Sequence, residues 1–265
     1  MMPNQNKSIV AAIKHFISSH PEIAPEIEKY AAKAQGKSDE DFLNFAEWKQ
    51  YQNLSTQQIF ERIYAEGHWG KNQSQNDRFF SGTGSHDPRI VHTYVDDVAE
   101  FVNNLSGPLS ALDIGCGDFN VGSKLRGLFS TYKAVDIANN IIDYNRTKFV
   151  DLDVDFNVLD LVKEAPPYAD VIFLRQVLQH LSNAQIMKAL ENLEGRFAHL
   201  ILTEHLPPGE FKPNIDKTTG RGIRIRHYSG VDIGQPPFNF RSGGQKILSE
   251  VSELGGIIRT TAYSR

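Results

Sequence analysis

The chain has 265 residues, of which 40% are hydrophobic and 23% charged, and these fractions are ordinary for a soluble globular protein. Its net charge of −4 gives no electrostatic case for nucleic-acid binding, and its single cysteine excludes an internal disulfide and a cysteine-rich metal site. No apolar run reaches the roughly 18 residues that a membrane-spanning helix needs, and no signal-peptide pattern opens the chain. We therefore expect a cytoplasmic protein.

Residues 1 to about 105 are predicted to be mainly helical. Apolar side chains recur at helical spacing in three stretches of the first 52 residues. A fourth helix is expected to begin after Ser55, because Ser55 and Gln58 have the spacing of a capping box. Asp87-Pro88 then predicts the start of a fifth helix, with the proline in the first helical position.

A loop rich in glycine, hydroxyl and aromatic residues separates the last two of these helices, at 67–85. Glycines allow a tight backbone path there, and hydroxyl groups can bind a ligand. The loop is either a lid over a cofactor or a surface loop packed by its own aromatic rings. In the first case its substrate-contacting residues are expected to be Trp69, Ser81 and Ser85.

From about residue 106 short apolar runs alternate with helical patterns. Five runs are expected to be strands, at 110–115, 132–137, 154–159, 169–175 and 199–205. The alternation predicts an α/β fold with a doubly wound, mostly parallel sheet in residues 106–265, preceded by a helical lid or substrate region in residues 1–105. An irregular segment, 206–243, is followed by an expected helix at about 244–254 and a last strand at 257–263.

The first strand leads into the sequence Asp113-Ile114-Gly115-Cys116-Gly117. Two glycines one residue apart, between a strand and a helix, let the backbone pass close to a nucleotide-like ligand. A dinucleotide site would place a third glycine where this chain has Asn120. The acidic Asp113 suits a positively charged ligand, such as S-adenosylmethionine (SAM), which carries a sulfonium and an ammonium group.

Acidic residues also stand at the ends of the next two strands. Asp136 follows Asp113 at about the separation in sequence at which a second acidic residue binds the ribose diol in such folds. Asp160 ends the third strand. Arg175 and Gln176 end the fourth strand. Because ligands of open α/β sheets lie outside the carboxyl ends of the strands, these side chains are expected to meet in one site.

Leu112 to Gly117, Asp136, Asp160 and the segment 169–181 together resemble the class I SAM-dependent methyltransferases, which have a Rossmann-like fold. The resemblance covers about residues 108–205. It implies a seven-stranded sheet with one antiparallel strand, and SAM bound along its carboxyl edge. One of the two last strands of that sheet is either missing or drawn from 206–243. A sequence like that of residues 79–85 also precedes the SAM domain in bacterial methyltransferases associated with polysaccharide biosynthesis.

The resemblance also implies roles for individual residues. Asp113, Gly115 and Gly117 would cradle the methionine part of SAM, Asp136 would bind the ribose with Ile137 beside the adenine, Asp160 and Leu161 would contact the adenine, and Gln176 would flank the sulfonium. Arg175 is expected to contact the substrate.

A hydroxyl acceptor needs a base, and His180, Glu204 and His205 are the candidates. The two histidines are favoured, because imidazole takes up a proton near neutral pH. Each candidate also has a structural interpretation: His180 could bind backbone at a helix start, and Glu204 could pair with an arginine.

A basic cluster in the irregular segment comprises Arg221, Arg224, Arg226 and His227. It is either a solvated loop or a contact surface for an anionic substrate.

We expect a SAM-dependent methyltransferase that acts on a small molecule, with a hydroxyl group of a sugar-like compound as the acceptor. Two alternatives stay open. A nicotinamide-dependent oxidoreductase is disfavoured by Asn120 and by the lack of a Tyr-x-x-x-Lys sequence. A non-catalytic SAM-binding module would use the helical region as a partner surface. The sequence predicts no metal site, no membrane association and no nucleic-acid partner.

Overall fold

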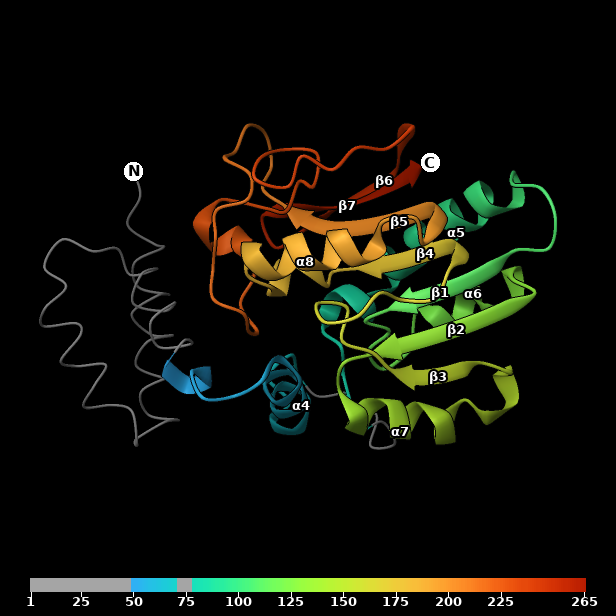
Figure 1. Ribbon diagram of the computed structural model, residues 1–265, viewed down its shortest axis with the longest axis horizontal. Coiled ribbons are helices and arrows are strands. Elements are labelled where there is room, and N and C mark those ends of the chain that lie inside the picture. Colours follow the sequence, from blue (N-terminus) through green and yellow to red (C-terminus); the bar gives the residue numbers. More distant parts are fainter. Residues whose placement is uncertain (1–48, 71–77) are drawn as a thin grey trace, which may run out of the picture.

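The computed structural model describes residues 49–70 and 78–265 (Figure 1). The first two predicted helices lie outside this part of the chain, and of the third only residues 49–51 are described, which are helical. At the centre lies a seven-stranded sheet in the order β3-β2-β1-β4-β5-β7-β6. Its strands are β1 (Ser110–Ile114), β2 (Thr131–Asp136), β3 (Asp155–Val158), β4 (Ala169–Arg175), β5 (Phe197–Leu206), β6 (Gly244–Glu253) and β7 (Gly256–Ser264).

The sheet is parallel from β3 to β5, and β7 runs antiparallel to both of its neighbours. This arrangement confirms the prediction of a mostly parallel sheet with a single antiparallel strand. The chain adds β2 and β3 on one side of β1 and then crosses over to add β4 on the other side. Such a switch point leaves room for a ligand beyond the carboxyl ends of the strands.

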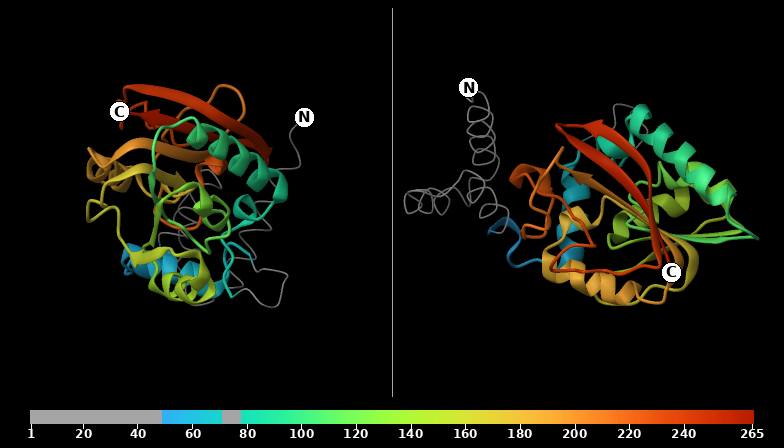
Figure 2. Two further views of the ribbon diagram at one scale, coloured as in Figure 1. Left: turned by 90° about the vertical axis from the view of Figure 1, so that its right-hand side faces the viewer. Right: turned by 90° about the horizontal axis from the view of Figure 1, so that it is seen from above.

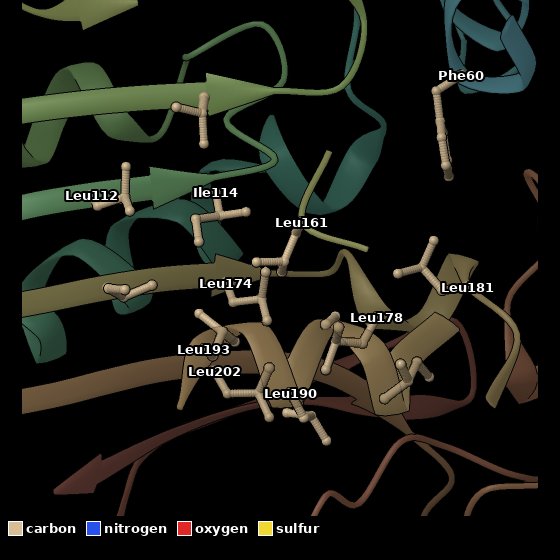
Figure 3. Close-up of a cluster of buried hydrophobic side chains, with 14 of the residues drawn as sticks. Phe60, Leu112, Ile114, Leu161, Leu174, Leu178, Leu181, Leu190, Leu193 and Leu202 are labelled. Atoms are coloured by element: carbon tan, nitrogen blue, oxygen red, sulfur yellow. The ribbon is translucent and has the colours of Figure 1, made fainter. Parts of the chain in front are cut away.

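Helices cover both faces of the sheet (Figure 2). On one face α8 (Asn183–Leu193) buries its apolar side chains against the even-numbered residues of β1, β4 and β5, such as Leu112, Ile172 and Leu200. Figure 3 shows part of this cluster. On the other face α5 (Pro88–Asn103) and α6 (Gly122–Leu125) pack against the odd-numbered residues of the same strands. A strand turns alternate side chains to opposite faces, so a strand that is covered on both faces needs apolar side chains at both odd and even positions.

Two predicted helix starts are confirmed. In α4 (Thr56–Glu66) the hydroxyl of Ser55 accepts the backbone N–H of Gln58, and the Gln58 side chain accepts the N–H of Ser55 in return. In α5 the carboxylate of Asp87 accepts the N–H of Arg89, and Pro88 stands in the first position. α7 (Asn139–Lys148) lies where a helix is predicted between the second and third strands.

The predicted helix at 244–254 is wrong, because these residues form the edge strand β6. Leu254 and Gly255 both have positive φ, 46° and 73°, and make the two-residue turn of a hairpin between β6 and β7. β6 pairs with β7 alone, and most of its side chains are exposed, so it lacks the apolar run that marks a buried strand. Both of the last strands are therefore present, and neither comes from 206–243.

The segment between β5 and β6 has little regular structure and folds back over the end of β4. Its anchor is Arg224, which is 1% exposed and donates hydrogen bonds to three backbone carbonyls after β4: those of Leu178, Gln179 and Leu181. A buried guanidinium needs such a set of acceptors to offset its desolvation. Among the described residues no helix is long and apolar enough to cross a membrane.

Candidate active site

A cavity of about 380 Å³ opens beyond the carboxyl ends of the central strands. The loops after β1, β2, β3 and β4 form its floor, and α4, residues 81–85 and residues 221–226 form its walls. Every site residue predicted from the sequence lines this cavity except Glu204. Tyr64, Phe60, Asp118 and Gln179 also line it, and the sequence did not single them out.

The turn after β1 requires its two glycines. Gly115 and Gly117 have φ values of 73° and 56°, in the left-handed region that side chains disfavour. A Cβ atom would collide with Val177 at the first position and with the Ser81 hydroxyl at the second. The turn is therefore packed closely on the loop after β4 and on the loop before α5, and it leaves its other side open to the cavity.

Two buried carboxyl groups, of Asp113 and Asp136, flank this turn. Asp136 accepts the N–H of Gly117 at 3.1 Å and that of Ala138 at 3.0 Å, so it joins the loops after β1 and β2. Burial raises the pKa of Asp136 to about 6. Burial likewise raises the pKa of Asp113 to about 7, although the hydroxyl of Tyr132, at 3.3 Å, lowers it. A cationic ligand in the cavity would stabilise both ionised forms.

Asp118 fastens the loop before α5 to the glycine turn. Its carboxylate accepts the backbone N–H of Ser81 at 2.9 Å and the ring N–H of His86 at 2.6 Å. In return the Ser81 hydroxyl accepts the N–H of Asp118 at 2.8 Å. The sequence signal was available, because an acidic residue directly follows the second glycine, but its partner lies 37 residues away in the chain.

Arg175, at the end of β4, holds the same loop from the other side. Its guanidinium donates to the carbonyl of Gly84 at 2.5 Å and to the hydroxyl of Ser85 at 3.1 Å, and lies 5.0 Å from the ring centre of Tyr94. Residues 81–85 are thus attached at two points beside the cavity that they line.

One wall of the cavity is aromatic. The ring of Trp69 lies 6.2 Å from that of Phe60, 4.9 Å from that of Tyr64 and 5.1 Å from that of His180, between ring centres. Three buried polar atoms of this wall have no hydrogen-bond partner within the described part of the chain: Trp69 Nε1, Gln179 Oε1 and His180 Nδ1. Unpaired buried polar atoms are costly, so a ligand that pairs with them gains affinity.

Residues 112–198 match a family model described as a methyltransferase domain. These residues form a methyltransferase domain. This identification sets aside the oxidoreductase interpretation. No protein of curated function is similar to the methyltransferase in sequence.

Solved structures share the fold of the methyltransferase. The N-methyltransferase NodS from Bradyrhizobium japonicum, in complex with S-adenosylhomocysteine (SAH), is 14% identical, with a TM-score of 0.53 over 79% of this chain and 98% of NodS. A SAM-dependent methyltransferase from Leishmania major is also 14% identical, with a TM-score of 0.54 over 82% of this chain and 88% of the other.

NodS was solved with SAH, the demethylated form of SAM, and the residues that line the cavity of this chain fit that cofactor. The cradle that a Cβ atom would fill at Gly115 and Gly117 admits a ligand backbone closely. The buried carboxyl groups of Asp113 and Asp136 suit a ligand that brings positive charge and hydroxyl groups. Beyond them, Ile137, Asp160 and Leu161 line the end of the cavity below β2 and β3.

The three candidate bases of the methyltransferase lie in different surroundings. His180 lines the cavity within the aromatic wall. Loss of contact with water, together with the nearby positive charge of Lys217, lowers the pKa of His180 to about 3, so its ring is neutral at pH 7. His205 lines the cavity too, but its Nε2–H is donated to the carbonyl of Glu253 at 2.9 Å, which ties the ring to the β6–β7 hairpin.

Glu204 is buried on the opposite side of β5 from His205 and does not line the cavity. Burial raises the pKa of Glu204 to about 8, against the attraction of the Arg224 guanidinium. The alternation of side chains along a strand explains the difference, since neighbours on β5 must face opposite ways. Glu204 therefore belongs to the packing between β5 and the segment anchored by Arg224.

Proposed function

We propose that the methyltransferase transfers the methyl group of SAM to a hydroxyl group of a small, ring-shaped polar compound, such as a sugar-like molecule. The observation that carries this proposal is the aromatic wall with its three unpaired polar atoms. The faces of Trp69 and Phe60 suit the flat apolar side of a ring, and the unpaired atoms suit its hydroxyl groups. SAM supplies a methyl group on a positively charged sulfur.

His180 and Gln179 are the proposed acceptor-binding pair. The Nε2 atoms of the two side chains lie 3.4 Å apart. Because the amide of Gln179 can turn by 180°, its oxygen can accept the Nε2–H of the imidazole, and its NH₂ group then takes the unpaired position and can donate to the acceptor. The lone pair of His180 Nδ1 is then free to accept the hydrogen bond of an acceptor hydroxyl, and a neutral ring is the form that accepts it. Because the ring is a weak base, it takes up the proton only as the oxygen gains the methyl group of SAM and becomes strongly acidic, while SAH leaves.

The test of the proposed function is an assay with SAM labelled in its methyl group and a panel of neutral, acidic and phosphorylated monosaccharides together with their amino-sugar analogues. We expect label in an O-methyl product, with the methylated atom located by mass spectrometry. Label only at nitrogen, or none in any member of a panel that includes both classes, contradicts the proposal.

Replacing His180 by glutamine is expected to lower the methylation rate on the order of 10²-fold, because the proton acceptor is lost. The dissociation constant of SAM, measured by calorimetry, should stay within about twofold, because the change lies outside the glycine turn and the two buried carboxyl groups. His199→Gln is the matched control: it also removes a half-buried imidazole, but outside the cavity. Equal rates for the two variants would show that His180 is not the base.

Asp113 and Asp136 are proposed to meet the ammonium group and the ribose hydroxyls of SAM. With pKa values of about 7 and 6, both are largely ionised at pH 8, and both lose their charge as the pH falls. The ionised forms attract a cation, so SAM affinity should fall between pH 8 and pH 6, by up to about tenfold per pH unit for each group. The Asp113→Asn variant should bind SAM more weakly than the unchanged protein at pH 8, and its SAM affinity should depend less on pH. Calorimetric titrations with SAM at pH 8, 7 and 6 measure both effects. A slope as steep as that of the unchanged protein would contradict the assignment.

A further inference from the structure

The structure divides the basic cluster of residues 221–227 into two parts. Arg224 is buried, and its guanidinium donates hydrogen bonds to the carbonyls after β4, to the carbonyl of Ile215 and to the side-chain oxygen of Asn183. Arg221 and Arg226, by contrast, line the cavity. Because Arg224 anchors their segment, Arg221 and Arg226 are held at the cavity wall.

Charge is distributed unevenly around the cavity. Its carboxylates gather around the glycine turn and below β2, β3 and β6. The wall built from residues 56–69, 177–181 and 221–226 brings two guanidinium groups to the cavity, and no aspartate or glutamate of these ranges lines the cavity. We call it the acceptor wall. A concave surface with charges of one sign concentrates the potential and attracts the opposite charge.

The two arginines differ in their support. Arg221 donates to Nδ1 of His68 at 3.2 Å, and Nε2–H of that ring is donated to the carboxylate of Glu66 at 2.6 Å. These contacts orient Arg221 from behind. Arg226 is exposed at the cavity and makes no ion pair with any residue of 49–70 or 78–265. An oriented guanidinium beside an uncompensated one is a good receptor for a carboxylate or phosphate, because each offers paired donors.

We propose that Arg221 and Arg226 bind an anionic group of the methyl acceptor, so that the substrate class is an acidic or phosphorylated ring compound. The proposal rests on the proposed function in one respect, namely that the anion and the methylated hydroxyl belong to one molecule. In the bound acceptor, the anionic group would lie at Arg221 and Arg226, and the hydroxyl group to be methylated would lie at His180.

The electrostatics of His180 agree with this placement. The positive charges of Lys217 and Arg224 both lower the pKa of that ring, in addition to its loss of contact with water. Glu204, which lies near Arg224, has a pKa of about 8 and is mostly uncharged at pH 7, so it does little to offset these charges. A bound anion would raise the pKa of the His180 ring toward its ordinary value.

The test uses small probes, since the whole acceptor is not needed. The full-length protein is saturated with SAH, and acetate, methylphosphonate and the uncharged acetamide are titrated at constant ionic strength. Binding is followed by saturation-transfer NMR of the probe methyl groups. We expect a signal from at least one anion and none from acetamide, with acetate preferred if the acceptor is a carboxylic acid and methylphosphonate preferred if it is a phosphate ester.

Three variants assign the signal to the acceptor wall. Arg226→Gln and the double variant R221Q/R226Q should weaken anion binding by at least about tenfold, in line with the loss of charge-assisted hydrogen bonds. Arg241→Gln removes the same charge from an exposed position of the same segment outside the cavity, and should leave binding unchanged. Equal signals from acetamide and the anions, no anion signal, or full binding by the double variant would overturn the proposal.

A parallel titration with SAH separates this proposal from the proposed function. Unchanged SAH affinity in all three variants, together with lost anion binding, supports the anion site. If the unchanged protein binds the anions yet methylates no hydroxyl in the acceptor panel, the proposed acceptor atom is wrong and the anion site stands.

Discussion

Replacing Asp136 by alanine is expected to weaken SAM binding roughly 10³-fold, because it removes a charged acceptor of two hydrogen bonds, each worth about 1.5–3 kcal/mol. In the described structure the carboxylate already accepts two backbone N–H groups, of Gly117 and Ala138. Its loss therefore acts twice: the proposed partner of the ribose hydroxyls disappears, and the glycine turn loses the contact that joins it to the loop after β2.

Calorimetric titration with SAM measures this effect, and thermal unfolding without ligand separates its two parts. Asp136→Asn is the informative second variant, because its amide keeps one acceptor oxygen but sets an NH₂ group against a backbone N–H. It should bind SAM with intermediate affinity. Asp151→Ala, at an exposed position outside the cavity, is the control. If Asp136→Ala binds SAM as well as this control, the carboxylate does not contact the cofactor.

The core of the fold was predictable because the central strands β1, β4 and β5 carry apolar side chains toward both faces of the sheet and have polar residues at or near their carboxyl ends. β1 and β4 begin and end within a residue of the predicted runs. β6 lacks the pattern of a buried strand because an edge strand pairs on one side only and needs no apolar run. Its signal is instead the Leu254-Gly255 turn that joins it to β7.

The residues proposed to bind the cofactor could be brought together from the sequence more completely than those proposed to bind the acceptor, for a physical reason. Asp113, Asp136 and Asp160 stand at the ends of strands, where the topology of the sheet alone brings them together. Glu204 could have been excluded on the same grounds, since its neighbour His205 has the opposite orientation on β5. The acceptor wall depends on contacts between segments far apart in the chain, such as Arg221 with His68, and local patterns do not encode these.

Arg224 anchors the segment that carries Arg221 and Arg226 to the loop after β4. Its replacement by methionine is expected to lower the free energy of unfolding by about 3–5 kcal/mol, the usual cost of removing one member of a buried charged network. The side chain donates five hydrogen bonds, to three carbonyls after β4, to the carbonyl of Ile215 and to the amide of Asn183. Methionine fills similar space but leaves these acceptors unpaired. Lysine should not restore stability, because a single ammonium cannot reach acceptors spread around a planar fork.

Chemical denaturation measures the loss, and limited proteolysis between β5 and β6 shows where it falls. Arg226→Met is the matched control, since it removes the same side chain two residues away from a position that is exposed. Adding Glu204→Gln to Arg224→Met should cost less than the sum of the two single changes, because the buried carboxyl and guanidinium groups attract one another. Equal stability of the Arg224→Met and Arg226→Met variants would mean that the segment holds its place without this anchor, and that the position of Arg221 and Arg226 at the cavity has another cause.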